Sequence, residues 1–174
     1  MAHDLLIRSM TRTEVDTLVD WAAAEGWNPG LHDAELFWQT DPEAFVAAEL
    51  DDVLIGGGAI TAYGREFGFM GFFIIRPEFR GRGLGNILWH ARRDQLLDRL
   101  KSGATIGMDG VFAMQDFYAK GGFVFSHRNL RFALQRTTAS SSAVDPHIRQ
   151  LDSNLFAEVQ AYDRHCFPAP RDSF

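Results

Sequence analysis

Ile75-Arg76-Pro77-Glu78-Phe79-Arg80-Gly81-Arg82-Gly83-Leu84-Gly85-Asn86 is the stretch that decides the fold of this chain. An apolar run precedes it and an apolar repeat at helical spacing follows it, so the stretch joins a strand to a helix. The first N–H groups of a helix have no partner within the helix and carry a partial positive charge, which suits a phosphate. Glycines let the backbone approach a ligand closely, and arginines add forked donors. The predicted phosphate-binding residues are Arg80, Gly81, Arg82, Gly83, Leu84, Gly85 and Asn86.

The spacing of the glycines excludes the two commonest nucleotide-binding loops. A P-loop ends in Lys-Ser or Lys-Thr, and neither pair occurs in this stretch. The dinucleotide-binding loop has the spacing G-x-G-x-x-G, whereas Gly81, Gly83 and Gly85 follow one another at every second position. The residues alone leave two readings, which are a phosphate loop of another kind and a glycine-rich turn without a ligand.

Length and composition indicate a single folded domain. The chain has 174 residues, of which 46% are hydrophobic and 13% aromatic, which is enough to build a core. Its net charge of −6 argues against a nucleic-acid surface. A single cysteine, Cys166, excludes an internal disulfide and a Cys-rich zinc site, and we expect no metal. We find no signal peptide and no apolar stretch of membrane-spanning length, so we expect a cytoplasmic enzyme without a membrane partner.

The periodicity of apolar residues predicts a mixed α/β (α+β) domain in which helices flank a central sheet. Thr11 and Glu14 form a capping box at the start of the first helix. The three glycines at 56–58 either weaken a strand or mark a bulge, and Gly71 marks a splay in the next strand. The apolar face expected for the long helix consists of Leu84, Ile87, Leu88, Ala91 and Leu97. The expected strands are residues 5–8, 45–50, 53–63, 67–75, 105–108, 123–126 and 129–134, and the later expected helices are residues 33–39, 83–100 and 113–120.

The segment Arg80-x-x-Gly83-x-Gly85 resembles the [RQ]-x-x-G-x-[GA] motif of the GNAT acetyltransferases, and the order of the predicted elements resembles that fold over residues 5–135. The resemblance implies that residues 80–86 bind the pyrophosphate of acetyl-CoA. It also implies that Phe73, Ile74 and Ile75 pair with the pantetheine arm as an added strand would.

A second motif lies about thirty residues further on. Phe117-Tyr118-Ala119-Lys120-Gly121-Gly122-Phe123 resembles the F-Y-x-K-x-G-F motif of the same family. In that family, this tyrosine lies near the sulfur of acetyl-CoA and protonates the departing thiolate, so the resemblance implies that Tyr118 is the general acid. A phenol of pKa about 10 can protonate a thiolate whose conjugate acid has a pKa of about 8.5.

The proton acceptor and the amine site are less well marked. Asp109 and Glu49 are the candidate bases, with His127 and a chain of water molecules as alternatives. The resemblance implies that the amine acceptor enters between the first two helices and the last hairpin. The residues expected there are Trp27, Asn28, Phe37, Trp38, Met70 and His127.

The sequence divides into residues 1–136 as the GNAT domain, 137–144 as a Ser/Thr/Ala-rich linker and 145–174 as a C-terminal extension. Residues 148–151 and 155–165 repeat the strand-then-helix opening of the chain, which suggests the start of a truncated second lobe; an ordinary terminal helix is the alternative. The expected function is transfer of an acetyl group from acetyl-CoA to a primary amine, on a small molecule or a peptide. A non-catalytic acyl-CoA-binding module and a nucleotide-binding protein are the rival hypotheses, and a homodimer stays open.

Overall fold

The computed structural model describes residues 5–135 and 145–173, which form two units. The first unit contains residues 5–108 together with 168–173, and the second contains the described residues 109–135 and 145–167. The predicted linker at 137–144 lies outside the described residues. No helix within the described ranges is long and apolar enough to cross a membrane.

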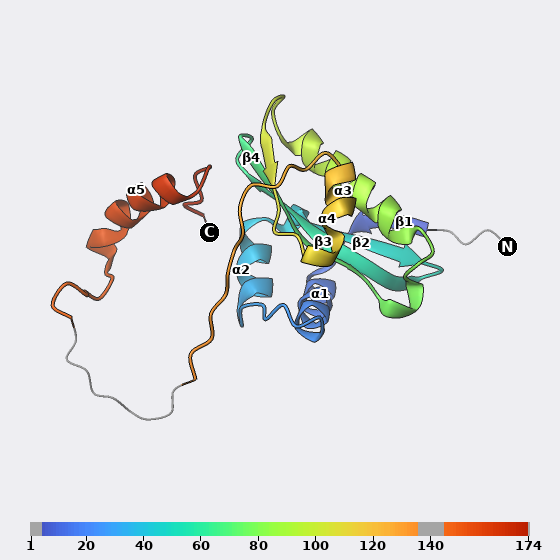
Figure 1. The fold of residues 1–174 in the computed structure, drawn as a ribbon, viewed down its shortest axis with the longest axis horizontal. Helices are drawn as coiled ribbons and strands as arrows, with labels where there is room; N and C mark the ends of the chain where they lie inside the picture. Colours follow the sequence, from blue (N-terminus) through green and yellow to red (C-terminus); the bar gives the residue numbers. More distant parts are fainter. Residues whose placement is uncertain (1–4, 136–144, 174) are drawn as a thin grey trace. The chain divides into compact units, whose positions relative to one another are not determined.

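The first unit is a five-stranded sheet with helices on both faces (Figure 1). The strands lie in sequence order; β1 to β4 pair antiparallel, and β4 pairs with β5 in parallel. Helices α1 and α2 lie on one face and α3 on the other (Figure 1). This arrangement is the mixed, helix-flanked sheet that the sequence predicts. The elements are β1 Leu5–Ser9, α1 Arg12–Ala24, α2 Asp33–Thr40, a 3-10 turn Pro42–Ala44, β2 Phe45–Leu50, β3 Val53–Tyr63, β4 Phe67–Ile75, a 3-10 turn Pro77–Phe79, α3 Leu84–Arg99 and β5 Thr105–Gly107.

Local sequence accounts for the start of α1. The Thr11 side chain accepts from the N–H of Glu14, and the Glu14 carboxylate accepts from the N–H of Thr11, so the predicted capping box is present in both directions. The apolar side of α1 then packs against the sheet in a core that includes Val15, Leu18 and Phe45. The last residues of the chain belong to the same unit, where Ala169 is fully buried and the hydroxyl of Thr40 donates to the carbonyl of Ser173 at 3.1 Å.

The buried face of α3 differs from the predicted one. Leu88 is buried as expected, but Ile87 and Leu97 are 50% and 49% exposed. The residues that face the sheet are Leu88, Trp89, Arg92 and Leu96. The predicted face was wrong in part, because it was drawn from apolar residues alone and so left out Arg92, which the structure buries.

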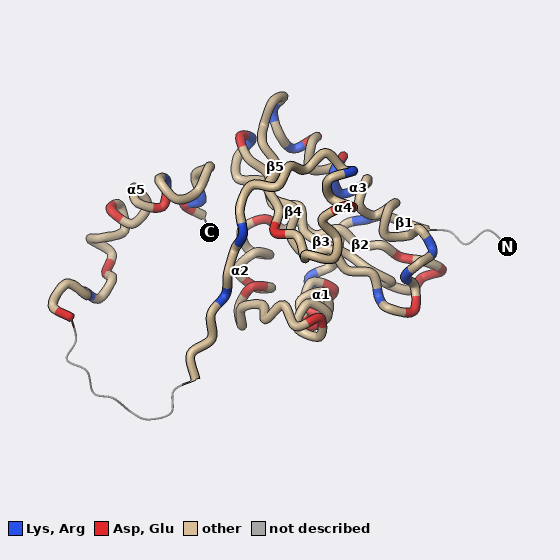
Figure 2. Tube along the Cα trace, in the orientation of Figure 1, with Lys and Arg blue, Asp and Glu red and all other residues tan. Residues whose placement is uncertain are grey.

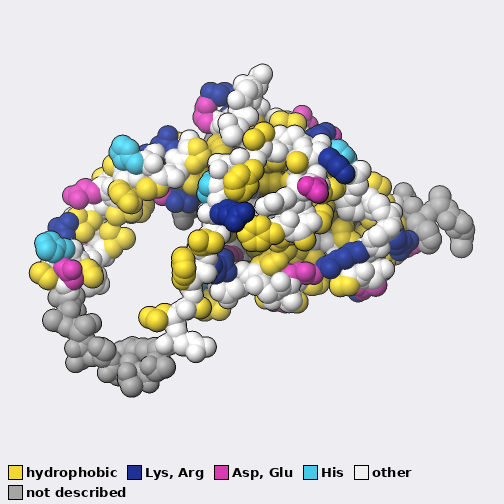
Figure 3. Space-filling model, in the orientation of Figure 1, with side chains coloured by type: hydrophobic (Ala, Val, Ile, Leu, Met, Phe, Trp, Pro, Cys, Tyr) yellow, Lys and Arg dark blue, Asp and Glu magenta, His cyan; other side chains and the backbone are white. Residues whose placement is uncertain are grey.

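The second unit contains a 3-10 turn Phe112–Met114, α4 Gln115–Lys120, a 3-10 turn Ser153–Leu155 and α5 Phe156–Cys166. The helices predicted at 113–120 and 155–165 are therefore confirmed. The strands predicted at 123–126, 129–134 and 148–151 are not formed in the described parts of this unit. Their apolar side chains have no strand beside them to pack against: Val124, Phe132 and Leu134 are about nine-tenths exposed. Apolar side chains also line the surface of α5 (Figure 3).

Candidate active site

A glycine-rich loop connects β4 to α3 and has the backbone geometry of a phosphate cradle. Gly81 and Gly83 have φ of 73° and 79°, in the left-handed region that glycine adopts without strain. Gly83 is the N-cap of α3, and no other group lies within 4 Å of where its Cβ would be. The unpaired N–H groups in the first turn of this sixteen-residue helix therefore directly follow a residue that has no side chain to block them.

The two arginines of this loop have different partners. The Nε of Arg80 donates to the carbonyl of Ile75 at 2.7 Å, and its Nη2 forms an ion pair with Glu25 at the end of α1. Arg82 is exposed and lies over the ring of Phe79, with 5.7 Å between guanidinium carbon and ring centroid. Arg80 thus binds the loop to the end of β4, while Arg82 carries its charge at the surface.

The edge of β4 beside this loop is paired with β5 over only part of its length. Pairing with β5 covers only the start of the strand, from Phe67 with Thr105 to Phe69 with Gly107, although β4 continues to Ile75. The last part of β4 contains Phe73, Ile74 and Ile75, the residues that the sequence assigns to pantetheine. An extended ligand with amide groups can hydrogen-bond to such an edge as a peptide does when it adds a strand.

A β-bulge separates the two parts of β4. Gly58 pairs with Phe73 and Ala59 with Gly71, so Phe72 is an extra residue, with φ of 22°. The bulge immediately follows Gly71, where the sequence predicts a splay. The ring of Trp27, from the turn between α1 and α2, stacks on Phe72 at 6.5 Å and 4°. Bulges re-aim the residues that follow them, so this one sets the direction of the strand edge at 73–75.

The glycines at 56–58 allow three close approaches to β3. A Cβ at Gly56 would collide with the side chain of Ile75, and one at Gly57 with the side chain of Met10. A Cβ at Gly58 would collide with the carbonyl of Phe72 and the guanidinium of Arg92. The pairing of β2 with β3 also shifts beside Gly56, where the sequence predicts weakening or a bulge.

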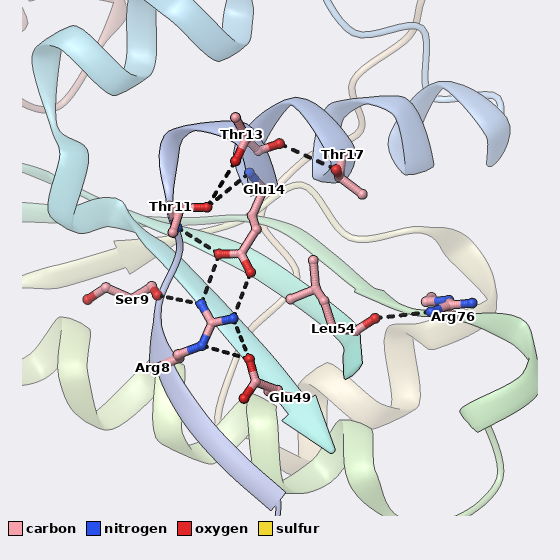
Figure 4. A network of polar contacts seen from close by, with 9 residues as sticks. All are labelled: Arg8, Ser9, Thr11, Thr13, Glu14, Thr17, Glu49, Leu54 and Arg76. Carbon is pink, nitrogen blue, oxygen red and sulfur yellow. Dashed lines mark hydrogen bonds and ion pairs between the residues drawn. The ribbon is translucent and has the colours of Figure 1, made fainter. Parts of the chain in front are cut away.

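Glu49, a candidate base, lies in an ion-pair network on β1 and β2 (Figure 4). Arg8 donates to the Glu49 carboxylate through Nε at 3.0 Å and Nη2 at 2.5 Å, and also contacts both oxygens of Glu14. Hydrogen bonds from Arg8 lower the pKa of Glu14 to about 2, and those same pairs raise the pKa of Arg8. The Arg8 guanidinium therefore joins Glu49 on β2 to Glu14 on α1, and the Glu49 carboxylate is engaged in an ion pair.

This network predicts an acid-sensitive contribution to stability. Because the pKa of Glu14 falls from 4.5 to about 2 on folding, its contribution is present above pH 4.5 and is lost as the pH falls toward 2. We expect Glu14→Gln to lower the free energy of unfolding at pH 7 by about 2 kcal/mol, and the difference from wild type to vanish near pH 2. Urea unfolding of both proteins between pH 2 and pH 7 measures this difference. Glu43→Gln, which removes an exposed carboxylate, is the control. A difference that is independent of pH would contradict the assignment.

The second unit brings Tyr118 and Asp109 near one another. A Cβ at Gly110 would lie 2.6 Å from the Tyr118 ring, so that ring packs on the backbone of the residue after Asp109. The Asp109 carboxylate accepts from Nδ2 of Asn129 at 2.8 Å. The carbonyl of Tyr118 accepts from the N–H groups of Gly121 and Phe123, which close α4. The absence of a side chain at Gly110 lets the Tyr118 ring lie against the backbone next to Asp109.

Several residues expected at the acceptor site have other surroundings. Met70 is 3% exposed and therefore belongs to the core, and Phe37 and Trp38 pack against the core under α1. His127 is exposed beside Ser126 in the second unit. Trp27 packs at the bulge, and Asn28 borders a surface cavity of about 560 Å³. The cavity is lined by Val19, Asp20, Ala23, Gly26, Asn28, Pro29, Gly30 and Leu31.

Comparison with known proteins places this geometry in a family. The model of the acetyltransferase (GNAT) family matches residues 10–123, which is well over half of the chain. The chain belongs to the GNAT family. The matched region includes the glycine loop, the bulged β4 and the helix that bears Tyr118. Within the described residues, no group of three or more His, Cys, Asp or Glu side chains is arranged to hold a metal ion.

Two curated relatives are longer than this chain. A holothin acyltransferase from Pseudoalteromonas sp. (strain SANK 73390) is 31% identical over 112 residues, which cover 64% of this chain and 36% of that protein. An uncharacterized protein of Caenorhabditis elegans is 40% identical over 52 residues, which cover 30% of this chain and 15% of that protein. The chain thus matches about a third or less of the length of these relatives.

Solved GNAT structures share the fold. Ard1 from Thermoplasma volcanium superposes with a TM-score of 0.59 at 19% identity, over 71% of this chain and 84% of that one. A Mycobacterium tuberculosis protein solved in complex with CoA superposes with a TM-score of 0.55 at 17% identity, over 74% and 76%. At these identities the likeness concerns the fold alone.

Proposed function

We propose that this GNAT chain is an N-acetyltransferase that moves an acetyl group from acetyl-CoA to a primary amine by direct attack. One observation carries the proposal, namely that the glycine loop at the start of α3 directly follows the part of β4 that β5 leaves uncovered. A pyrophosphate bound by the loop would extend its pantetheine arm along that edge. A ligand with both groups fits this juxtaposition better than a phosphate alone.

The donor half of the site consists of three parts. Backbone amides of residues 81–86 bind the pyrophosphate, helped by the partial positive charge of the α3 N-terminus. Arg82 supplies a surface charge for the phosphates, and Arg80 holds the loop against Ile75. Backbone groups of Phe73, Ile74 and Ile75 pair with the amides of pantetheine.

The reaction needs a proton acceptor and a proton donor. The amine nitrogen attacks the thioester carbonyl carbon, the C–O π electrons move to oxygen, and a backbone N–H of β4 stabilises that oxygen. When the C–S bond breaks, the Tyr118 hydroxyl gives its proton to the sulfur. The proton lost by the amine goes to Asp109 or through water to solvent. We assign the base to Asp109 ahead of Glu49, because Arg8 occupies the Glu49 carboxylate.

The acceptor is expected at the turn between α1 and α2. This turn stacks Trp27 on the β4 bulge and borders the cavity with Asp20 and Asn28. Asp20 is exposed and gives this cavity an acidic group, which favours an amine in its ammonium form. The relative named holothin acyltransferase makes holothin a candidate acceptor.

A CoA-release assay tests the proposal. Acetyl-CoA and longer acyl-CoA donors are offered with a panel of amines that contains an amino acid, a polyamine, an aminoglycoside, a peptide and holothin. We expect free thiol to appear only when an acceptor amine is present, in a one-to-one ratio with the N-acyl product. CoA binding without release over the whole panel would favour a non-catalytic acyl-CoA-binding module and contradict the transferase proposal.

A further inference from the structure

Arg92 is a fully buried charged residue on the core-facing side of α3. Its exposed fraction is 0%, and it lies between Leu88 and Leu96, which are also fully buried. Burial of a guanidinium costs considerable free energy, which only well-placed acceptors can offset. An apolar side chain would fill this position on the helix without that cost, so the arginine calls for an explanation.

The guanidinium contacts the residues on both sides of the β4 bulge. Its Nη2 donates to the carbonyl of Gly71 at 2.5 Å, just before Phe72, and to the carbonyl of Ala59 at 2.6 Å on β3. Its carbon lies 5.3 Å from the ring centroid of Phe73, just after the bulge. Ala59 and Gly71 are paired across the two strands. Arg92 therefore holds β3, the bulge and the residue beyond it in one arrangement.

The opposite strand is shaped to admit this side chain. Gly58 pairs with Phe73, and a Cβ at this position would overlap both the guanidinium and the carbonyl of Phe72. Arg92 also lies two turns after the phosphate loop on the same helix. Because a helix is rigid over that length, α3 fixes the glycine loop and the bulge relative to one another.

We propose that Arg92 is a positioning residue for acyl transfer, an inference that rests on the proposed function. By holding the bulge, it aims the N–H groups of the following β4 edge at the thioester carbonyl. The hydrogen bond from the Arg92 guanidinium to the Gly71 carbonyl also polarises the Gly71–Phe72 peptide, which makes the Phe72 N–H a stronger donor. The buried positive charge behind the strand stabilises the negative charge that develops on the carbonyl oxygen.

Isotope-edited infrared spectroscopy tests this role without any acceptor amine. Acetyl-CoA labelled with ¹³C at the thioester carbonyl is bound to wild type, Arg92→Lys and Arg92→Met. We expect binding to wild type to lower the carbonyl stretching frequency relative to free acetyl-CoA, Arg92→Lys to reduce the shift, and Arg92→Met to abolish it. Lysine keeps the charge but lacks the planar guanidinium whose Nη2 donates to both carbonyls.

Steady-state kinetics separate positioning from a merely structural role. We expect Arg92→Met to lower kcat by roughly 10- to 100-fold while the KM for acetyl-CoA changes by less than about threefold. Arg93→Met, which removes the neighbouring, partly exposed arginine, is the matched control and should keep both the carbonyl shift and kcat. If Arg92→Met does not fold, Gly58→Ala displaces the guanidinium from the other side and should give the same loss.

Two different failures are distinguishable. A folded Arg92→Met enzyme with the carbonyl shift and kcat of wild type would overturn the role of Arg92 and leave the transferase proposal intact. A wild-type protein that neither binds acetyl-CoA nor releases CoA would overturn the proposed function and this inference with it. Arg92→Lys could also lose kcat and acetyl-CoA binding to the same extent, while the bound acetyl-CoA keeps the wild-type carbonyl shift. That result would assign Arg92 to stability alone.

Discussion

Gly83→Asp is expected to lower the affinity for CoA by on the order of 100-fold, because it harms the loop in two ways. Gly83 has φ of 79°, where a residue with a Cβ is strained, and it caps the helix whose amides would face the pyrophosphate. A carboxylate at this position also repels the phosphates. Titration calorimetry with CoA measures the loss directly.

Gly64→Asp is the matched control for this substitution. Gly64 lies in the turn between β3 and β4, has φ of 61°, and has no other group within 4 Å of its Cβ position. The strain and the added charge are therefore similar, and both variants should lose about 1–2 kcal/mol of stability. Only Gly83→Asp should lose CoA binding. Equal affinities in the two variants would show that the loop is not the phosphate site.

Tyr118→Phe is expected to lower turnover by on the order of 100-fold or more, within the range that a general acid contributes. The substitution removes one oxygen and keeps the ring that packs on Gly110, so CoA affinity should stay nearly unchanged. The wild-type rate should fall at alkaline pH as the phenol loses its proton. Initial rates of CoA release across pH 6–11 measure both effects.

Tyr162→Phe, at an exposed position on α5, controls for the loss of a phenol as such and should behave as wild type. If Tyr118→Phe kept full activity at every pH, the phenol would not be the proton donor. Loss of CoA affinity in step with turnover would instead assign the hydroxyl to cofactor binding.

The glycine loop proposed to bind the donor can be predicted from a short stretch of sequence. The conformation of residues 80–86 can be predicted locally, because glycines that adopt left-handed backbone directly precede a run of helix-forming residues. Thr11 and Glu14 likewise define a helix start within one turn. Features of this kind depend on neighbours in the chain, which a sequence displays directly. Acidic and basic residues are interspersed along the described parts of the chain (Figure 2).

The features that sequence reasoning missed depend on tertiary neighbours. Arg92 lies four residues from both Leu88 and Leu96, so its spacing predicts a core position. A charged residue is nevertheless expected to face solvent. Only the fold shows that Gly58 leaves space for the guanidinium and that the Gly71 carbonyl accepts its hydrogen bond. The apolar alternation at 129–134 favours a strand, yet a strand needs a partner edge, which the pattern does not supply. The ion pair that engages Glu49 arises from pairing of β1 with β2, and so appears only in the fold.

The central claim is that the glycine loop and the uncovered edge of β4 form a single acyl-CoA site. Thermal unfolding with saturating CoA, ATP or NAD tests it most directly, because a ligand that binds only the folded state raises the Tm. The account predicts a clear rise with CoA, little change with ATP or NAD, and loss of the CoA effect in Gly83→Asp but not in Gly64→Asp. A rise with ATP or NAD and none with CoA would contradict it.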